Sequence, residues 1–186
     1  MLHLLNLEEI ESWLLKVPAL VKRFEEREPD FFPAVKSWLA GVEDTLGKNR
    51  LPQASEIAAC RSALISIERG FLNGVALPSK MGARNLKEAQ AGHVLKRAAD
   101  AVMEAIRSRR GQIDEASRVM MQIVAVADHL GLIPNDAGLN HTAYLQSILL
   151  AISNRAELAS LAVHVTGILG KTDVLIVLDR SIANIR

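Results

Sequence analysis

Histidine and aspartate side chains stand on both sides of one predicted connection, which makes them candidates for a metal site. Asp128 and His129 precede the connection, Asp136 lies within it and His141 follows it. Closing the connection would bring His129 and His141 together, and imidazole and carboxylate groups are ligands that Zn²⁺ prefers. However, no His/Glu pair has the four-residue helical spacing of many metal sites. The pattern is weak, and a helix-end residue and a neighbour of a helix cap explain both histidines without a metal.

The run Gly170-Lys171-Thr172, followed by the apolar residues 174–178 and Asp179, has the order found at the end of a phosphate-binding loop. Such a loop needs another glycine five residues before Gly170, so that backbone N–H groups can surround the phosphates. Val165 occupies that position, and the residues around it have helical spacing. We therefore expect a helix that stops at Gly170 and a new helix capped by Thr172, with no nucleotide or other cofactor.

His93 begins the order His93-Val94-Leu95-Lys96-Arg97 within a predicted helix. This order is similar to that of histidine phosphotransfer domains, which use a helical His-x-Leu-Lys sequence usually followed by glycine, and to the dimerisation helices of some sensor kinases. The resemblance covers four or five residues and implies that His93 is an exposed phospho-acceptor, with Lys96 offsetting the phosphoryl charge. Arg97 departs from the pattern, because it replaces the usual glycine. The alternative is an ordinary histidine on a helix surface.

The charges and the cysteine favour no other chemistry. The 22 basic and 21 acidic side chains leave a net charge of +1. The densest basic group does not form one helical stripe and is interrupted by acids, so nucleic acid is not favoured as a partner; it comprises Lys96, Arg97, Arg107, Arg109 and Arg110. Cys60 is the only cysteine and lies on a predicted apolar face, where we expect a buried thiol rather than a reactive one.

The element that organises the chain is a heptad seam over residues 85–130. Its members alternate at steps of four and three, and Arg109 is the one polar side chain among them: Leu95, Ala99, Val102, Ile106, Arg109, Ile113, Ala116, Met120, Ile123, Ala127 and Leu130. Asn85 and Glu88 form a capping-box pattern at its start. Asn6 and Glu9 repeat that pattern at the start of the chain.

The remaining apolar residues also have helical spacing. Hydrophobic residues make up 49% of the chain and aromatic residues only 4%, a composition that favours helices. Pro18 is expected to break the first helix near Val17, and the third predicted helix extends to Phe71 and Leu72. No strand with a paired hairpin turn is evident. We therefore predict an all-α bundle of about six to eight helices around the long, possibly kinked, helix near 85–130.

Domain organisation follows from the connections. The chain is predicted to be a single helical domain, 1–186, or an N-terminal part, 1–74, and a C-terminal part, 85–186, joined by a loop at 74–84. Arg107–Gly111 has the basic residues and the glycine of a helix end, but the seam continues through it. One long helix, in an elongated and dimeric protein, is therefore favoured over a turn at Gly111 that would give a compact bundle.

These features favour a non-enzymatic protein that acts through protein–protein contact, as an adaptor, a chaperone-like protein or a regulatory module. The alternatives are a phosphotransfer module using His93 and a helical enzyme of unknown chemistry. The expected partner is another protein or a second copy of the chain, in a homodimer. A lone cysteine, early acidic residues and the lack of a long apolar run favour a cytoplasmic protein without a membrane segment.

Overall fold

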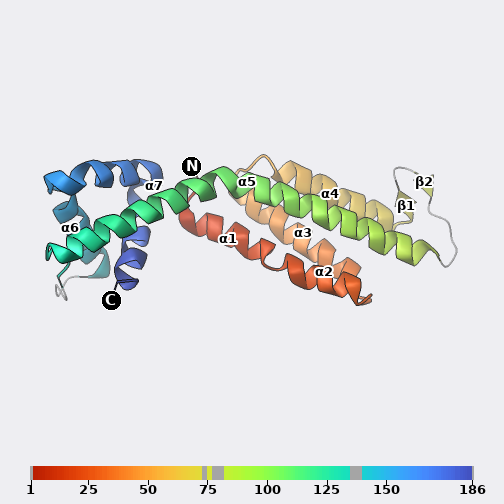
Figure 1. Cartoon of the computed structure of the whole chain (residues 1–186). Coiled ribbons are helices and arrows are strands. Elements are labelled where there is room, and N and C mark those ends of the chain that lie inside the picture. The colour runs from red at the N-terminus through yellow and green to blue at the C-terminus, as the bar shows by residue number, and fades with distance from the viewer. Residues whose placement is uncertain (1, 73–74, 77–81, 135–139, 186) are drawn as a thin grey trace. The chain divides into compact units, whose positions relative to one another are not determined.

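The structure is a computed structural model of the whole chain, and it describes residues 2–72, 75–76, 82–134 and 140–185 (Figure 1). The predicted all-α class is confirmed. The helices are α1 Leu4–Leu14, α2 Val17–Glu25, α3 Phe31–Lys48, α4 Ala54–Glu68, α5 Gly82–His129, α6 His141–Ser153 and α7 Ala156–Ala183. A small hairpin of β1 Phe71–Leu72 and β2 Val75–Ala76 lies between α4 and α5.

The long helix α5 carries the predicted seam. It passes through Gly111 as one element, and every seam residue is buried except Leu130, which is half-buried. Its end is a Schellman motif, in which the N–H of Leu132 donates to the carbonyl of Ala127 and Gly131 has a φ of 68°. Glycine suits that position because a positive φ costs it little.

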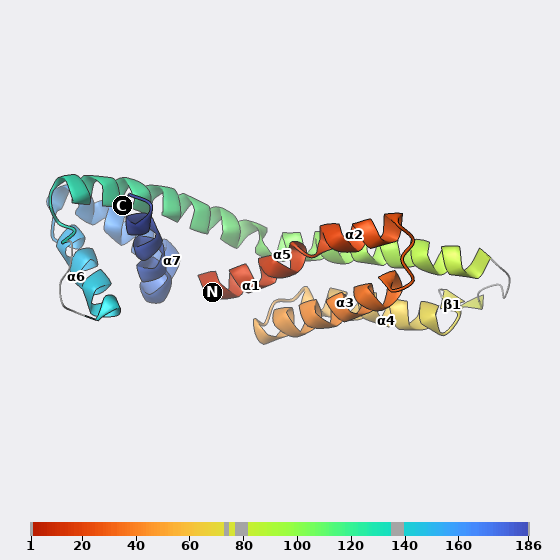
Figure 2. The same ribbon diagram turned by 90° about the horizontal axis from the view of Figure 1, so that it is seen from below.

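The chain packs as two compact units, and the division falls within α5. The N-terminal unit comprises Leu2 and Leu4–Ser108, and the C-terminal unit comprises His3 and Arg109–Arg186. In the N-terminal unit, α3 and α4 lie side by side, with α1 and α2 following one another along the first part of α5 (Figures 1 and 2). Of the predicted connection at 74–84, residues 74 and 77–81 lie outside the described residues.

The C-terminal unit combines the second part of α5 with α6 and α7. Asn140 caps α6 as expected, since its side chain accepts a hydrogen bond from the N–H of Ala143 at 2.8 Å. The helix α7 is broken at Gly170, where φ is 81° and ψ is 172°, and its two halves run in different directions (Figure 1). By length and composition alone α7 is apolar enough to cross a membrane, a feature that the sequence prediction did not include.

Several predicted boundaries are wrong. Both capping-box patterns lie inside helices, because α1 begins at Leu4 and α5 at Gly82, ahead of Asn6 and Asn85. In α1 the reason is the burial of Leu4. Its packing extends the helix beyond Asn6, because a capping residue contributes only about 1 kcal/mol. Phe71, predicted as helical, lies in β1, because α4 ends at Glu68 and Gly70 follows with a φ of 90°.

Candidate functional site

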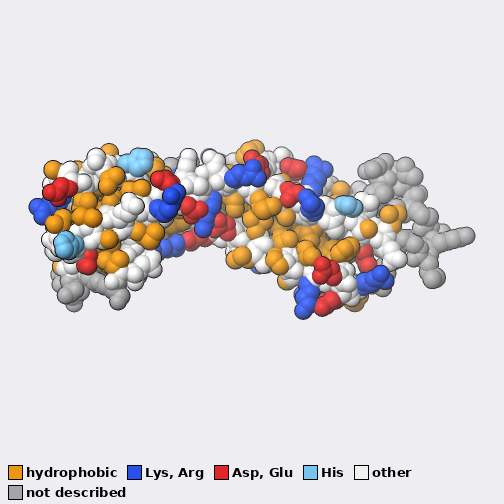
Figure 3. All heavy atoms as spheres, in the orientation of Figure 1, with side chains coloured by type: hydrophobic (Ala, Val, Ile, Leu, Met, Phe, Trp, Pro, Cys, Tyr) orange, Lys and Arg blue, Asp and Glu red, His pale blue; other side chains and the backbone are white. Residues whose placement is uncertain are grey.

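An apolar groove in the N-terminal unit is the most distinctive surface feature of the described residues. We name it the α2–α5 groove, and its volume is about 400 Å³. Figure 3 shows hydrophobic side chains gathered over this part of the unit. Its lining comes from α2, the start of α3 and the first part of α5: Val17, Val21, Phe24, Phe31, Ala89, Gly92, His93, Leu95, Lys96, Ala99 and Asp100.

The two walls of the groove differ in side-chain size. On α2 the lining residues Val17, Val21 and Phe24 recur at steps of four and three, so they form one stripe on that helix. Val21 remains 41% exposed and Phe24 39% exposed, so the unit leaves part of each side chain uncovered. The α5 wall includes three small residues, Ala89, Gly92 and Ala99, beside larger ones, whereas the α2 wall has no residue smaller than valine.

Gly92 is the smallest residue on the α5 wall of the groove. A Cβ atom placed on Gly92 would lie 3.6 Å from the nearest ring carbon of Phe24, an ordinary van der Waals distance. Close packing therefore does not require glycine at this position. A larger side chain there would instead extend into the α2–α5 groove, which makes Gly92 the natural place to block it.

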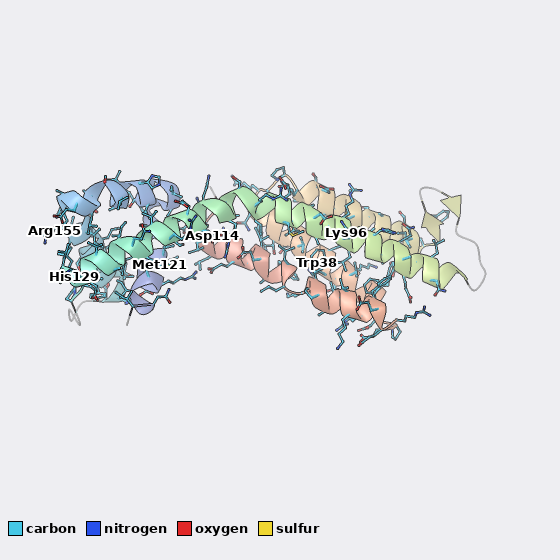
Figure 4. All side chains as sticks on the ribbon, in the orientation of Figure 1. Trp38, Lys96, Asp114, Met121, His129 and Arg155 are labelled. Carbon is cyan, nitrogen blue, oxygen red and sulfur yellow. The ribbon has the colours of Figure 1, made fainter. Side chains whose placement is uncertain are left out.

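Leu20 is the only buried residue of α2, so the helix is held mainly by contacts at its two ends. The indole Nε1–H of Trp38 donates to the carbonyl of Trp13 at 2.8 Å, just before α2 begins. Trp13 donates in turn to the hydroxyl of Thr45 at 3.0 Å. A Cβ atom on Gly41 would lie only 2.2 Å from the Trp13 ring, so α3 needs glycine there. Trp38 is buried, and Figure 4 marks its position.

The other end of α2 is held by a ring contact and by ion pairs of Arg23. The rings of Phe24 and Phe31 lie 5.2 Å apart between centroids, in a tilted arrangement typical of aromatic pairs. Arg23 forms an ion pair with Asp30 across the turn. The stripe of α2 is thus held in place opposite α5 although little of α2 itself is buried.

His93 and Lys96 lie at the rim of the α2–α5 groove, on α5. The predicted phospho-acceptor His93 is exposed in the middle of a helix, and Lys96 follows three residues later (Lys96 is labelled in Figure 4). However, the Lys96 ammonium lies 2.7 Å from a carboxylate oxygen of Asp100. The charge of Lys96 is therefore already offset by a neighbour on its own helix.

The other candidate ligands and loops do not form a site among the described residues. His129 ends α5 and is exposed (Figure 4), whereas His141 places Nε2 3.0 Å from Asp179. No three His, Cys, Asp or Glu side chains within the described part of the chain gather as metal ligands would, and Asp136 lies outside it. Gly170 joins two helical segments, so the strand that a phosphate-binding loop requires is missing there.

The clustered basic side chains form ion pairs or are buried, and Cys60 is buried. Four of the basic residues at 96–110 are exposed and pair with acids: Lys96 with Asp100, Arg97 with Glu56, Arg107 with Glu104, and Arg110 with Asp114. The fifth, Arg109, is buried. Cys60 is also buried, and burial raises the pKa of its thiol, which disfavours the reactive thiolate.

Comparison with known proteins gives no relative: no family model, curated protein or solved structure matches the chain. The function must therefore be argued from the chain's own geometry. The α2–α5 groove was not predicted from the sequence. Its only sequence signal is the stripe Val17, Val21 and Phe24, which equally suits a buried helix face.

Proposed function

We propose that the protein acts without catalysis, by binding an amphipathic helix of a partner protein in the α2–α5 groove. The observation that supports this most directly is that Val21 and Phe24 are left partly exposed in an apolar groove whose α5 wall includes Ala89, Gly92 and Ala99. Large apolar side chains left open in a groove are typical of sites that exchange water for a partner.

A helix suits the groove better than an extended peptide. An extended peptide gains much of its affinity from backbone hydrogen bonds to a sheet edge, whereas both walls here are helices whose own backbone groups are paired. The α5 wall from Ala89 to Asp100 spans about 16 Å at 1.5 Å per residue, the length of three helical turns. Small residues on that wall let a third helix approach closely.

The rim charges indicate that apolar contact would supply most of the affinity. Lys96 pairs with Asp100, Lys22 with Glu26, and Arg23 with Asp30, so the charges along α2 and α5 are largely offset within the unit. Exposed pairs contribute little and are screened by salt. A partner helix therefore needs apolar residues at three- and four-residue spacing more than it needs a particular charge.

A photo-cross-linking experiment tests this proposal. A cross-linking amino acid is placed at Val21 in the groove or, as a control, at the exposed Val163 of the C-terminal unit. We expect Val21 alone to capture a partner segment with apolar residues at helical spacing. The variant Gly92→Leu should abolish this capture, while Gly111→Leu, on the same helix with no atom within 4 Å of its Cβ position, should not.

The same experiment separates a partner from self-association. If the captured segment comes from a second copy of the chain, the groove is the interface of a homodimer, and Gly92→Leu should convert dimer to monomer in sedimentation analysis. Equal capture from Val21 and Val163, or capture that survives Gly92→Leu, would overturn the proposal.

The exposure of His93 favours a second candidate, phosphoryl transfer. A neutral imidazole nitrogen of His93 would attack the phosphorus of an acyl phosphate, releasing the carboxylate and forming a phosphoramidate. Incubation with acetyl phosphate, followed by mass spectrometry, tests this. A modification that is acid-labile and lost in His93→Gln supports it, and an unmodified chain counts against it.

A further inference from the structure

Arg109 is the one polar residue of the α5 seam, and it is buried in the C-terminal unit. Its side chain is 8% exposed. The guanidinium donates from Nη1 to the carbonyl of Ile168 at 2.8 Å and to Gln112 at 3.3 Å. Its Nη2 lies 3.5 Å from Asp173, whose side chain is only 2% exposed. A charged residue inside an apolar seam thus has charged and polar partners on another helix.

Those partners stand on both sides of the break in α7. Ile168 lies in the last turn before Gly170, where carbonyls lose their regular donors in the helix. Asp173 lies in the first turn after the break, where a carboxylate is favoured by the helix dipole. A cation is favourable at the C-terminal end of the first half, and Arg109 interacts with the second half through the negative charge of Asp173. Arg109 therefore joins the two halves of α7 to α5.

The apolar pattern of α7 explains why it must break. The buried residues of the first half are Leu158, Ala162, Val165 and Leu169, and those of the second half include Val174, Val177, Leu178 and Ile182. In one unbroken helix these two stripes would point about 165° apart, at 100° per residue. Both stripes can face the core of one unit only if the helix changes direction between them.

We propose that Arg109 is a conformational lock for residues 171–183, the second half of α7. With Arg109 in place, residues 171–183 are held against α5 and their apolar stripe is covered. Without it, the buried Asp173 loses its guanidinium partner, and residues 171–183 separate locally from α5 at the Gly170 break. Release uncovers Val174, Leu178 and Ile182, which are buried in the locked form. The lock lies outside the α2–α5 groove and does not depend on it.

The proposed lock predicts opposite effects for a single and a double substitution. Removing one member of a buried ion pair is costly, because it leaves the other charge buried, whereas replacing both with apolar residues is often tolerated. Arg109→Met should therefore release residues 171–183 from α5. Arg109→Met combined with Asp173→Leu should restore their packing against α5. His3, which clusters with this unit, also places Nδ1 3.5 Å from Asp173, so the measurements use one fixed neutral pH.

Hydrogen exchange of the full chain, followed by mass spectrometry, tests the lock. In Arg109→Met, amides of residues 171–183 should exchange about tenfold faster or more, the loss expected for a hydrogen bond to a charged group. Amides of 156–169 and of the N-terminal unit should keep their wild-type rates. The control is Arg110→Met, which removes an exposed pair with Asp114 from the same turn of α5 and should leave exchange unchanged.

Several results would overturn the lock. These are unchanged exchange at 171–183, equal acceleration across α6 and both halves of α7, the same effect from Arg110→Met, or no recovery in the double variant. If Arg109→Met does not fold, Asp173→Asn replaces it, because an amide of the same shape removes only the charge. Trypsin provides a second readout, since the exposed Lys171 lies beside the break and should be cleaved faster only in the released form.

Discussion

The N-terminal unit contains an apolar groove, whereas the C-terminal unit contains a buried charge pair. In the N-terminal unit apolar side chains are left half-exposed, on the short helix α2 that is held mainly at its ends. In the C-terminal unit a charged pair, Arg109 and Asp173, is buried beside a broken helix. Open apolar surface suits binding, and a buried charge pair suits the selection of one conformation. We therefore propose recognition for the first unit and conformational control for the second.

In the N-terminal unit, the ring of Trp13 lies directly against Gly41 of α3. In Gly41→Ala the new methyl group would lie 2.2 Å from the ring, so Trp13 and the start of α2 must move. We expect the free energy of unfolding of the N-terminal unit to fall by about 2–3 kcal/mol, the upper range for overpacking. Both tryptophans lie in this unit, so fluorescence during urea unfolding follows it selectively.

Gly47→Ala is the matched control in the same helix. No atom lies within 4 Å of its Cβ position, and alanine has the better helix propensity, so stability should be unchanged or raised by up to about 1 kcal/mol. Equal stability of Gly41→Ala and Gly47→Ala would contradict the role of Trp13 in holding α2.

In the C-terminal unit the corresponding change is Gly170→Ala. No atom blocks a Cβ there, but the φ of 81° is unfavourable for alanine and costs about 1–2 kcal/mol. Gly167→Ala, an open position in the first half of α7, is the control and should stabilise the unit. Circular dichroism should show earlier melting for Gly170→Ala, with the tryptophan signal unchanged. A shift in the tryptophan transition would show that the units do not unfold separately.

The smallest expected effect is at the rim of the α2–α5 groove. Lys96 is 77% exposed and pairs with Asp100, so Lys96→Ala should change stability by no more than about 0.5 kcal/mol. Partner binding through the groove should also survive this change and vary little with salt. A strong loss of binding would shift the proposed site from the apolar groove to its charged rim.

The sequence predicted the helices and the seam because both depend on local spacing. It could not predict the α2–α5 groove, since Val17, Val21 and Phe24 would form the same stripe on a fully buried helix. Arg109 was visible as an irregularity of the seam, but its partner Asp173 is 64 positions away and local rules do not connect them. The hairpin at Phe71 was missed because two-residue strands leave no alternating pattern.

The affinity of the captured partner helix for the wild type, Gly92→Leu and Gly111→Leu tests the role of the α2–α5 groove most directly. Titration calorimetry should give similar affinities for the wild type and Gly111→Leu and, for both, a negative heat capacity change from apolar burial. Gly92→Leu should fold normally but bind at least about tenfold more weakly, a loss of roughly 1.4 kcal/mol. Equal affinity for all three proteins would contradict a partner helix in the α2–α5 groove.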